Sequence, residues 1–267
     1  MIEVERLRCG YGSRDVIKGI SLKVGTGEMT GILGPNGSGK TTLMLAMAGV
    51  IPPREGTVRV CGEDILVKGA RWTARQAASV PQRSETSFPF KCLSLVLMGR
   101  YPYLNGWGTY SEEDMNAALE AMESTETMHL AHRKVREVSG GEAQMITIAR
   151  AFAQQTGILL LDEATSSLDA AHKMRIFDVL REKNLRGATI LCIMHDLNLA
   201  ALYCTRLIFL KNGEIALDGK TEEVFTDEYL SQIYETEIRV AGHPVTGAPQ
   251  AHFVPRAHGH VDPGSVG

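Results

Sequence analysis

Residues 34–41 (GPNGSGKT) carry the strongest chemical signal in the sequence. They match the pattern G-x-x-x-x-G-K-[ST], in which glycines let successive backbone N–H groups turn toward phosphate oxygens. A helix is predicted to follow, and its N-terminus adds positive charge at the same place. Lys40 is expected to reach the β- and γ-phosphates, and the Thr41 hydroxyl to bind Mg²⁺. The predicted ATP-binding residues of this loop are Gly34, Pro35, Asn36, Gly37, Ser38, Gly39, Lys40, Thr41 and Thr42.

Two adjacent carboxylates, Asp162 and Glu163, end the apolar run 158–161 (ILLL). A buried strand that ends in two charges is costly unless a cation or a polar substrate meets them. Asp162 is predicted to hold the Mg²⁺ shell, and Glu163 to polarise an attacking water. A strand that ends at solvent also carries Asp, so this motif is specific only beside the phosphate loop. Together the two motifs predict a P-loop NTPase, a class that includes kinases, helicases, GTPases and motors.

A third motif, residues 138–142 (VSGGE), precedes a predicted helix and forms another candidate anion-binding terminus. It lies shortly before the two-carboxylate strand and resembles the LSGGE signature of the ABC ATPase family. The resemblance implies that two copies of the chain sandwich two ATP molecules head to tail. Each copy then completes the site of the other with Ser139, Gly140, Gly141 and Glu142. Val138, Ala143, Met145 and Ala164 depart from the commonest family pattern, but none removes a group that touches phosphate or metal.

Five further residues fall at positions that the family pattern assigns to the nucleotide or to the dimer interface. The resemblance implies that Tyr11 stacks on adenine, that Val16 touches the nucleoside and that Gln82 reaches Mg²⁺ and the attacking water. Asp169, together with Ser166 and Ser167, matches the segment that crosses the dimer interface in the family. His195 matches the histidine that contacts the γ-phosphate. Alone, a tyrosine near a turn or a histidine at a strand end is an ordinary structural residue. The predicted catalytic residues are Glu163, His195, Gln82 and Lys40, and the predicted metal ligands are Thr41, Gln82 and Asp162.

Four segments resemble a narrower group, the ATPases of importers for iron-siderophore, haem and cobalamin complexes. They are residues 88–90 (FPF), 97–103 (LMGRYPY), 168–172 (LDAAH) and 194–201 (MHDLNLAA). This resemblance implies transmembrane permease subunits as partners and, indirectly, a substrate-binding protein. It also implies a place at the cytoplasmic face of the inner membrane. The sequence does not identify the transported cargo, and an oxyanion such as molybdate is an alternative to a metal–organic complex.

The helices and strands that must position these residues are predicted from the hydrophobic pattern, which changes along the chain. Short strands and turns dominate the first 65 residues, and the stretch 83–140 is mostly helical, with Ser111 and Asp114 as a helix cap. Apolar strands at 158–161 and 189–194 then alternate with helices at 170–183 and 197–203, which indicates a parallel sheet covered on both faces. Residues 207–217 are predicted to form a hairpin.

These patterns predict an α/β fold of the P-loop NTPase type, resembling an ABC ATPase. It combines a parallel-sheet core, an N-terminal antiparallel β subdomain and an inserted α-helical subdomain at about 83–140. One ATPase domain is predicted over residues 1–240, followed by a flexible tail at 241–267. That tail holds four histidines, His243, His252, His258 and His260, with no apparent ligand spacing, so incidental histidines are favoured over a metal site.

The composition disfavours several other classes of protein. Lys and Arg number 28 and Asp and Glu 31, so a protein that coats nucleic acid is disfavoured and no nucleic-acid partner is expected. No signal peptide or membrane-spanning run is apparent, and the five scattered cysteines fit free thiols. Two rivals remain: a soluble ABC ATPase of DNA repair or translation, and a module that binds ATP without hydrolysing it. The presence of Glu163 and His195 argues against the second.

Overall fold

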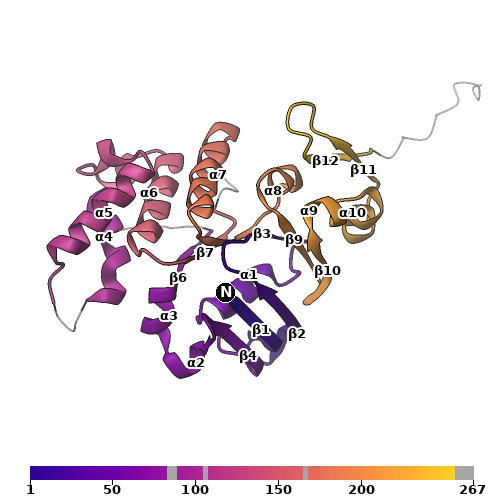
Figure 1. Cartoon of the computed structure of the whole chain (residues 1–267), viewed down its shortest axis with the longest axis horizontal. Coiled ribbons are helices and arrows are strands. Elements are labelled where there is room, and N and C mark those ends of the chain that lie inside the picture. The colour runs from indigo at the N-terminus through magenta and orange to yellow at the C-terminus, as the bar shows by residue number, and fades with distance from the viewer. Residues whose placement is uncertain (83–88, 105–107, 165–167, 256–267) are drawn as a thin grey trace, which may run out of the picture.

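The computed structural model describes residues 1–82, 89–104, 108–164 and 168–255 (Figure 1). Residues of the family pattern at 88, 166 and 167, and His258 and His260, lie outside these ranges. Among the described residues, no helix has both the length and the apolar character needed to cross a membrane. The elements form a central sheet, a separate antiparallel sheet, a group of helices and a C-terminal hairpin.

The antiparallel sheet holds the first part of the chain, as predicted. Its strands are β1 (Ile2–Tyr11), β2 (Arg14–Val24), β4 (Glu55–Val60) and β5 (Glu63–Asp64), in the order β2-β1-β4-β5. Apolar side chains alternate toward one face of the sheet, where they pack on helix α1 (Lys40–Met47). The alternation buries every second residue of a strand and therefore fixes which face meets the helix.

The central sheet is parallel except for one edge strand. Its order is β10 (Glu214–Lys220), β9 (Arg206–Lys211), β3 (Met29–Leu33), β8 (Thr189–Ile193), β7 (Ile158–Asp162) and β6 (Ala77–Val80), and β10 pairs antiparallel with β9. All residues of β3, β7 and β8 are buried. Alternate residues of β7 belong to two different cores, Leu159 and Leu161 to one and Ile158 and Leu160 to the other. The parallel-sheet core predicted from the all-apolar runs is confirmed.

Helices surround this sheet. The larger ones are α5 (Glu112–Ser124), α6 (Gly140–Ala153), α7 (Ala170–Leu185), α8 (Leu197–Tyr203) and α10 (Asp227–Tyr234). The shorter ones are α2 (Ile65–Lys68), α3 (Ala70–Gln76), α4 (Cys92–Leu97), α9 (Thr221–Val224) and the 3₁₀ turns η1 (Met98–Tyr103), η2 (Met128–Leu130) and η3 (Val135–Glu137). Figure 1 shows α4, α5 and α6 together at one side of the molecule.

The helical group extends beyond the predicted limit near residue 140, because α6 packs on α4 and α5 and runs to Ala153. The predicted cap of α5 is present: the Ser111 hydroxyl accepts from the Asp114 backbone N–H, and the Asp114 carboxylate accepts in return from the Ser111 N–H. Asp114 also accepts from the buried guanidinium of Arg100 at 2.8 Å. Arg100 in turn donates to the Ala153 carbonyl, so one buried cation holds three parts of the helical group together.

The C-terminal segment corrects one expectation. The sequence predicts a flexible tail from residue 241, yet β11 (Ile238–Gly242) pairs antiparallel with β12 (Pro249–Phe253), and this hairpin packs on α8 (Figure 1). The Asn198 amide of α8 accepts from the Ala251 N–H at 2.7 Å and donates to the Ala251 carbonyl. His243 accepts two backbone hydrogen bonds in the hairpin loop through Nδ1, which gives that histidine a structural contact.

Candidate nucleotide site

The phosphate loop connects β3 to α1, as the sequence predicts. Gly34, Gly37 and Gly39 have φ angles of 139°, 76° and 103°, values that favour glycine. At Gly34 a Cβ would also lie 2.1 Å from the Leu210 carbonyl oxygen, so the loop needs glycine there for space as well. The loop therefore turns tightly. It leaves the N–H groups of the first turn of α1, which have no partner within the helix, free to bind an anion.

Two buried charges and one hydroxyl meet where the loop enters α1. Lys40 Nζ donates to the carbonyl oxygens of Gly34 (2.9 Å) and Pro35 (3.1 Å). Thr41 Oγ1 donates to Asp162 Oδ1 at 3.2 Å, which joins the loop to the end of β7. Burial lowers the pKa of Lys40 and raises the pKa of Asp162. In the chain without ligand, burial thus leaves both charges poorly solvated, as expected at a site where an anion and a cation bind.

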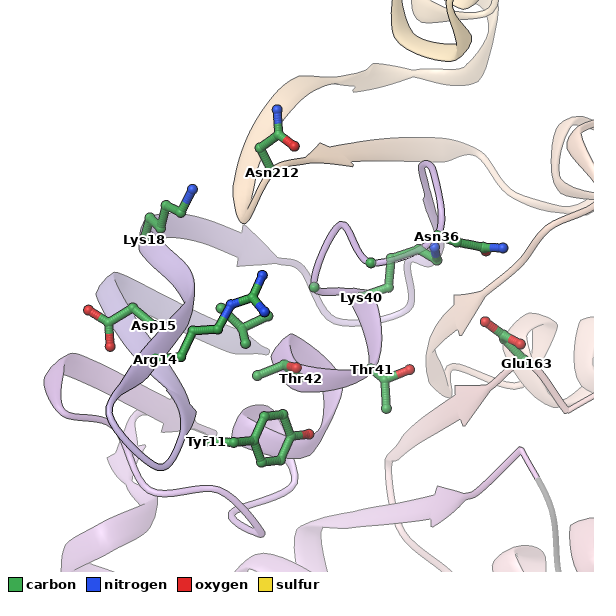
Figure 2. Close-up of a pocket in the computed structure, with 13 residues that line it drawn as sticks. Tyr11, Arg14, Asp15, Lys18, Asn36, Lys40, Thr41, Thr42, Glu163 and Asn212 are labelled. Atoms are coloured by element: carbon green, nitrogen blue, oxygen red, sulfur yellow. The ribbon is translucent and has the colours of Figure 1, made fainter.

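A cavity of about 640 Å³ lies over this loop (Figure 2). The predicted residues that line it are Tyr11, Val16, Asn36, Gly37, Gly39, Lys40, Thr41, Thr42 and Glu163. Gly34, Pro35 and Ser38 are not part of its wall. Ser38 instead supports the loop from behind, since its carbonyl accepts from the Gly213 N–H of the β9–β10 turn at 3.0 Å.

Four residues of the cavity wall were not predicted: Arg14, Asp15, Lys18 and Asn212. Arg14 and Lys18 lie on β2 two residues either side of Val16, so the period of a strand could have placed them on the predicted face. Figure 2 shows both side chains among the residues that line the cavity, and their positive charges favour phosphate groups there. Asn212 lies in a predicted turn, and nothing in the sequence connects that turn to the site. The turn reaches β2 through a hydrogen bond from the Lys18 N–H to the Gly213 carbonyl.

Glu163 lies at the centre of a second cluster. Its carboxylate contacts His195 Nε2 at 2.5 Å and accepts a short hydrogen bond from the Gln82 side chain. Gln82 follows β6, Glu163 follows β7 and His195 follows β8, so neighbouring parallel strands bring the three together at their carboxyl ends. The backbone of Glu163 has a φ of 46°. This left-handed conformation costs a non-glycine residue about 1–3 kcal/mol and occurs preferentially at functional sites.

The signature residues lie apart from this cavity. Ser139 caps α6 by accepting from the Glu142 N–H, and the Glu142 carboxylate accepts from the Ser139 N–H at 2.7 Å. Gly140 and Gly141 form the first turn of that helix. Asp169 is likewise outside the cavity and caps α7 by accepting from the His172 N–H at 2.9 Å. Within one chain these predicted residues do not reach the phosphate loop.

The fold and the site define a P-loop NTPase: a phosphate loop between a parallel strand and a helix, with an aspartate and a glutamate ending a second strand of the sheet. A family model for the ABC transporter matches residues 17–166. The chain is 40% identical to the hemin import ATP-binding protein HmuV of Streptomyces coelicolor, over 91% of this chain and 86% of that protein. It is 35% identical to the ferric enterobactin transport ATP-binding protein FepC of Escherichia coli, over 92% of this chain and 91% of that protein. The chain belongs to the ABC transporter family and is an ATPase of that family.

Solved structures agree with this assignment. A transporter assigned to the metal-chelate type of ABC transporters, in an inward-facing conformation, matches with a TM-score of 0.82 at 26% identity, over 95% of this chain and 96% of that chain. A dimeric ATP-binding cassette in a post-hydrolysis state, bound to ADP and Pi, matches with a TM-score of 0.73 at 27% identity, over 83% and 99% of the two chains. The predicted architecture, that of an ABC ATPase, is confirmed.

Proposed function

We propose that this chain powers an ABC importer by hydrolysing ATP at the cavity above the phosphate loop. The observation that carries the proposal is the contact of Gln82 and His195 with Glu163, which lines the same cavity as Lys40 and Thr41. Lys40 and the α1 N-terminus bind and orient the phosphates, and Tyr11 and Val16 hold the nucleoside. Glu163 accepts a hydrogen bond from the attacking water. With nucleotide bound, Gln82 would reach Mg²⁺ and this water and His195 would contact the γ-phosphate; without nucleotide both contact the Glu163 carboxylate. Fixed dipoles aimed at the transferring phosphoryl group supply the largest part of such catalysis.

The donor set at the end of β7 fits Mg²⁺. Thr41 and Asp162 present a hydroxyl and a carboxylate oxygen 3.2 Å apart, and Gln82 adds a carboxamide near Glu163. Oxygen donors of this kind are those that Mg²⁺ prefers. The buried Asp162 carboxylate, whose pKa is raised by burial, gains most from a cation. When bound, Mg²⁺ would neutralise charge that develops on the phosphate oxygens.

The proposed working unit is two copies of the chain. Ser139 to Glu142 and Asp169 lie outside the cavity of their own chain, and the related cassette bound to ADP and Pi is a dimer. The α6 N-terminus, with two glycines and a serine cap, offers free N–H groups to a phosphate of the other copy. Closing and reopening of the dimer then transmit the free energy of ATP binding and hydrolysis.

The proposed cargo is a metal–organic complex such as haem or a ferric siderophore. Support comes from the printed functions of the relatives, hemin import and ferric enterobactin transport, and from the structural likeness to a metal-chelate type transporter. Transmembrane permease subunits and a substrate-binding protein are the proposed partners. The chain would then work at the cytoplasmic face of the inner membrane, held there by the permease.

The first test is Glu163→Gln in the purified chain. We expect ATP turnover to fall by about 10²–10⁴-fold because the group that orients water is lost, while ATP binding persists and a dimer accumulates in light scattering. Glu182→Gln, at an exposed position of α7, is the control and should turn over normally. Unchanged turnover in Glu163→Gln would remove Glu163 from the proposed mechanism.

The second test concerns the transport role. Tagged chain is purified from its native membrane, its companions are identified, and the ATPase rate of the reconstituted complex is measured with hemin, a ferric siderophore, cobalamin and molybdate. Stimulation by one of the first three supports the proposal, and stimulation by molybdate alone replaces the cargo class. Co-purification with ribosomes or nucleic acid, and with no membrane protein, would favour a soluble ABC ATPase instead.

A further inference from the structure

Gly141 of the signature helix lies directly against the imidazole of His172. A Cβ added at Gly141 would fall 2.5 Å from His172 Cδ2 and 2.7 Å from Nε2, closer than real side-chain contacts allow. Gly141 is in the first turn of α6 with an ordinary helical backbone, and a positive φ does not require glycine there. Glycine destabilises a helix by about 1 kcal/mol relative to alanine. With His172 in this position, a side chain at residue 141 would collide with the ring, so the observed packing requires glycine there.

His172 is also fixed at its other nitrogen. Nδ1 lies 2.9 Å from both carboxylate oxygens of Asp169, and because a carboxylate only accepts, the proton is on Nδ1. The same carboxylate accepts from the His172 backbone N–H and so caps α7. These hydrogen bonds lower the pKa of Asp169, which keeps it ionised and in place. One imidazole thus contacts Asp169 on one edge and Gly141 on the other.

A second contact supports the same junction. Arg175 lies one turn after His172 on the same face of α7 and forms an ion pair with Glu126, just beyond α5. A cavity of about 230 Å³ between the two helical parts is lined by Glu126, Ser139, Glu142, His172 and Arg175, among others. Farther along the two helices, α7 and α6 share the large core and Lys183 lies over the Phe152 ring. At the N-terminal turns, where this cavity lies, His172 is the residue of α7 that lies against Gly141.

We propose that His172 is a positioning residue that couples the signature turn of α6 to the Asp169 turn of α7. This inference rests on the proposed two-copy function, in which both turns face the second copy. Because His172 links the two turns, both approach the nucleotide site of the other copy as one unit. Dimer closure over ATP then does not have to fix the position of each turn separately. Loss of the link leaves ATP binding at Lys40 intact and weakens closure.

The test uses the Glu163→Gln chain as parent and measures the ATP concentration at which half of it is dimeric. His172→Asn keeps a donor near Asp169 but lacks the half of the ring that touches Gly141, and His172→Gln reaches toward Gly141 but lacks the Nδ1 position. We expect each, like His172→Ala, to raise the required ATP concentration roughly tenfold, within the usual range of coupling between sites. Binding of a fluorescent ATP analogue to the monomer stays unchanged. Glu182→Ala on α7 is the matched control.

A compensating pair makes the test sharper. Gly141→Ala alone should weaken dimer formation because its methyl group collides with His172, and Gly141→Ala with His172→Ala should dimerise better than Gly141→Ala. A role limited to capping α7 predicts instead that His172→Asn equals the parent. That result, or absence of any relief in the double variant, overturns the coupling. If Gly141→Ala does not fold, the Asn and Gln variants carry the decision. A parent that forms no dimer with ATP overturns the proposed function itself, together with this inference.

Discussion

At the scale of single residues, the site contains residues in energetically unfavourable environments or backbone conformations. Lys40 and Asp162 are buried charges, and Glu163 is a non-glycine residue in the left-handed region. The buried Ser38 hydroxyl has no hydrogen-bond partner among the described residues. Groups of this kind destabilise the chain without its ligand and gain when phosphate and a cation arrive. Part of the stability that folding could have given the chain is therefore missing at the site until the ligand binds.

This argument predicts that Asp162→Asn stabilises the nucleotide-free chain. Folding raises the pKa of Asp162 because burial disfavours the carboxylate, so stability is lost as pH rises from the unfolded-state pKa through the folded one. Asn has nearly the same shape, can accept from Thr41 and carries no charge. We expect a gain of about 1 kcal/mol near pH 7, or roughly 2–4 °C in the melting midpoint. Calorimetry without nucleotide measures it, and a lower midpoint would contradict the prediction. The difference from wild type should shrink toward acidic pH.

At the scale of elements, the sequence predicted the order of strands and helices well where runs were all apolar or strictly alternating. It could not place Gln82, Glu163 and His195 in contact, because that depends on β6, β7 and β8 being neighbours in the sheet. The strand β6 (AASV) is too short and too weakly apolar to be recognised alone.

The hairpin β11–β12 was missed because its composition is that of a loop. Only Ala251 is buried in β12, and its backbone is held by the side chain of Asn198, which is far away in the sequence. Two of the group-specific segments now have structural explanations: Arg100 ties α6 to α5, and Asn198 holds β12. Such contacts join distant parts of the chain, so a pattern can indicate their importance but not their partners.

A prediction for this element follows from the Asn198 amide, which satisfies both backbone groups of Ala251. Asn198→Ala leaves a buried N–H without a partner, which costs about 1–3 kcal/mol. We expect hydrogen exchange at the Ala251 amide to accelerate by roughly 5–100-fold while the β7 and β8 amides keep their protection. His252→Ala, on the exposed face of the same strand, should leave exchange at Ala251 unchanged. Equal acceleration in β8 would mean that Asn198 supports the whole domain and not the hairpin alone.

At the scale of the whole molecule, the site joins two separate cores. Helix α1 and the antiparallel sheet belong to one core, and α6, α7 and α8 belong to the other, with the central sheet between them. Thr41 comes from the first side and contacts Asp162 at the end of β7, whose alternate residues enter both cores. A nucleotide bound in the proposed cavity would contact the phosphate loop on the first side and Glu163 after β7, at the strand ends where ligands of open α/β sheets bind.

The chain should accordingly melt as one unit with nucleotide and gain stability by mass action. At an ATP concentration 100 times the dissociation constant, binding adds about 2.7 kcal/mol, which for a domain of this size raises the melting midpoint by roughly 5–10 °C. Lys40→Ala should abolish most of the shift, because Lys40 is the buried cation of the phosphate loop. Lys220→Ala, an exposed lysine outside the cavity, should keep it. The measurement is differential scanning fluorimetry with and without MgATP. A full shift in Lys40→Ala would show that the nucleotide binds elsewhere, and two separate transitions, of which only one responds to ATP, would show that the two cores are not bridged by the site.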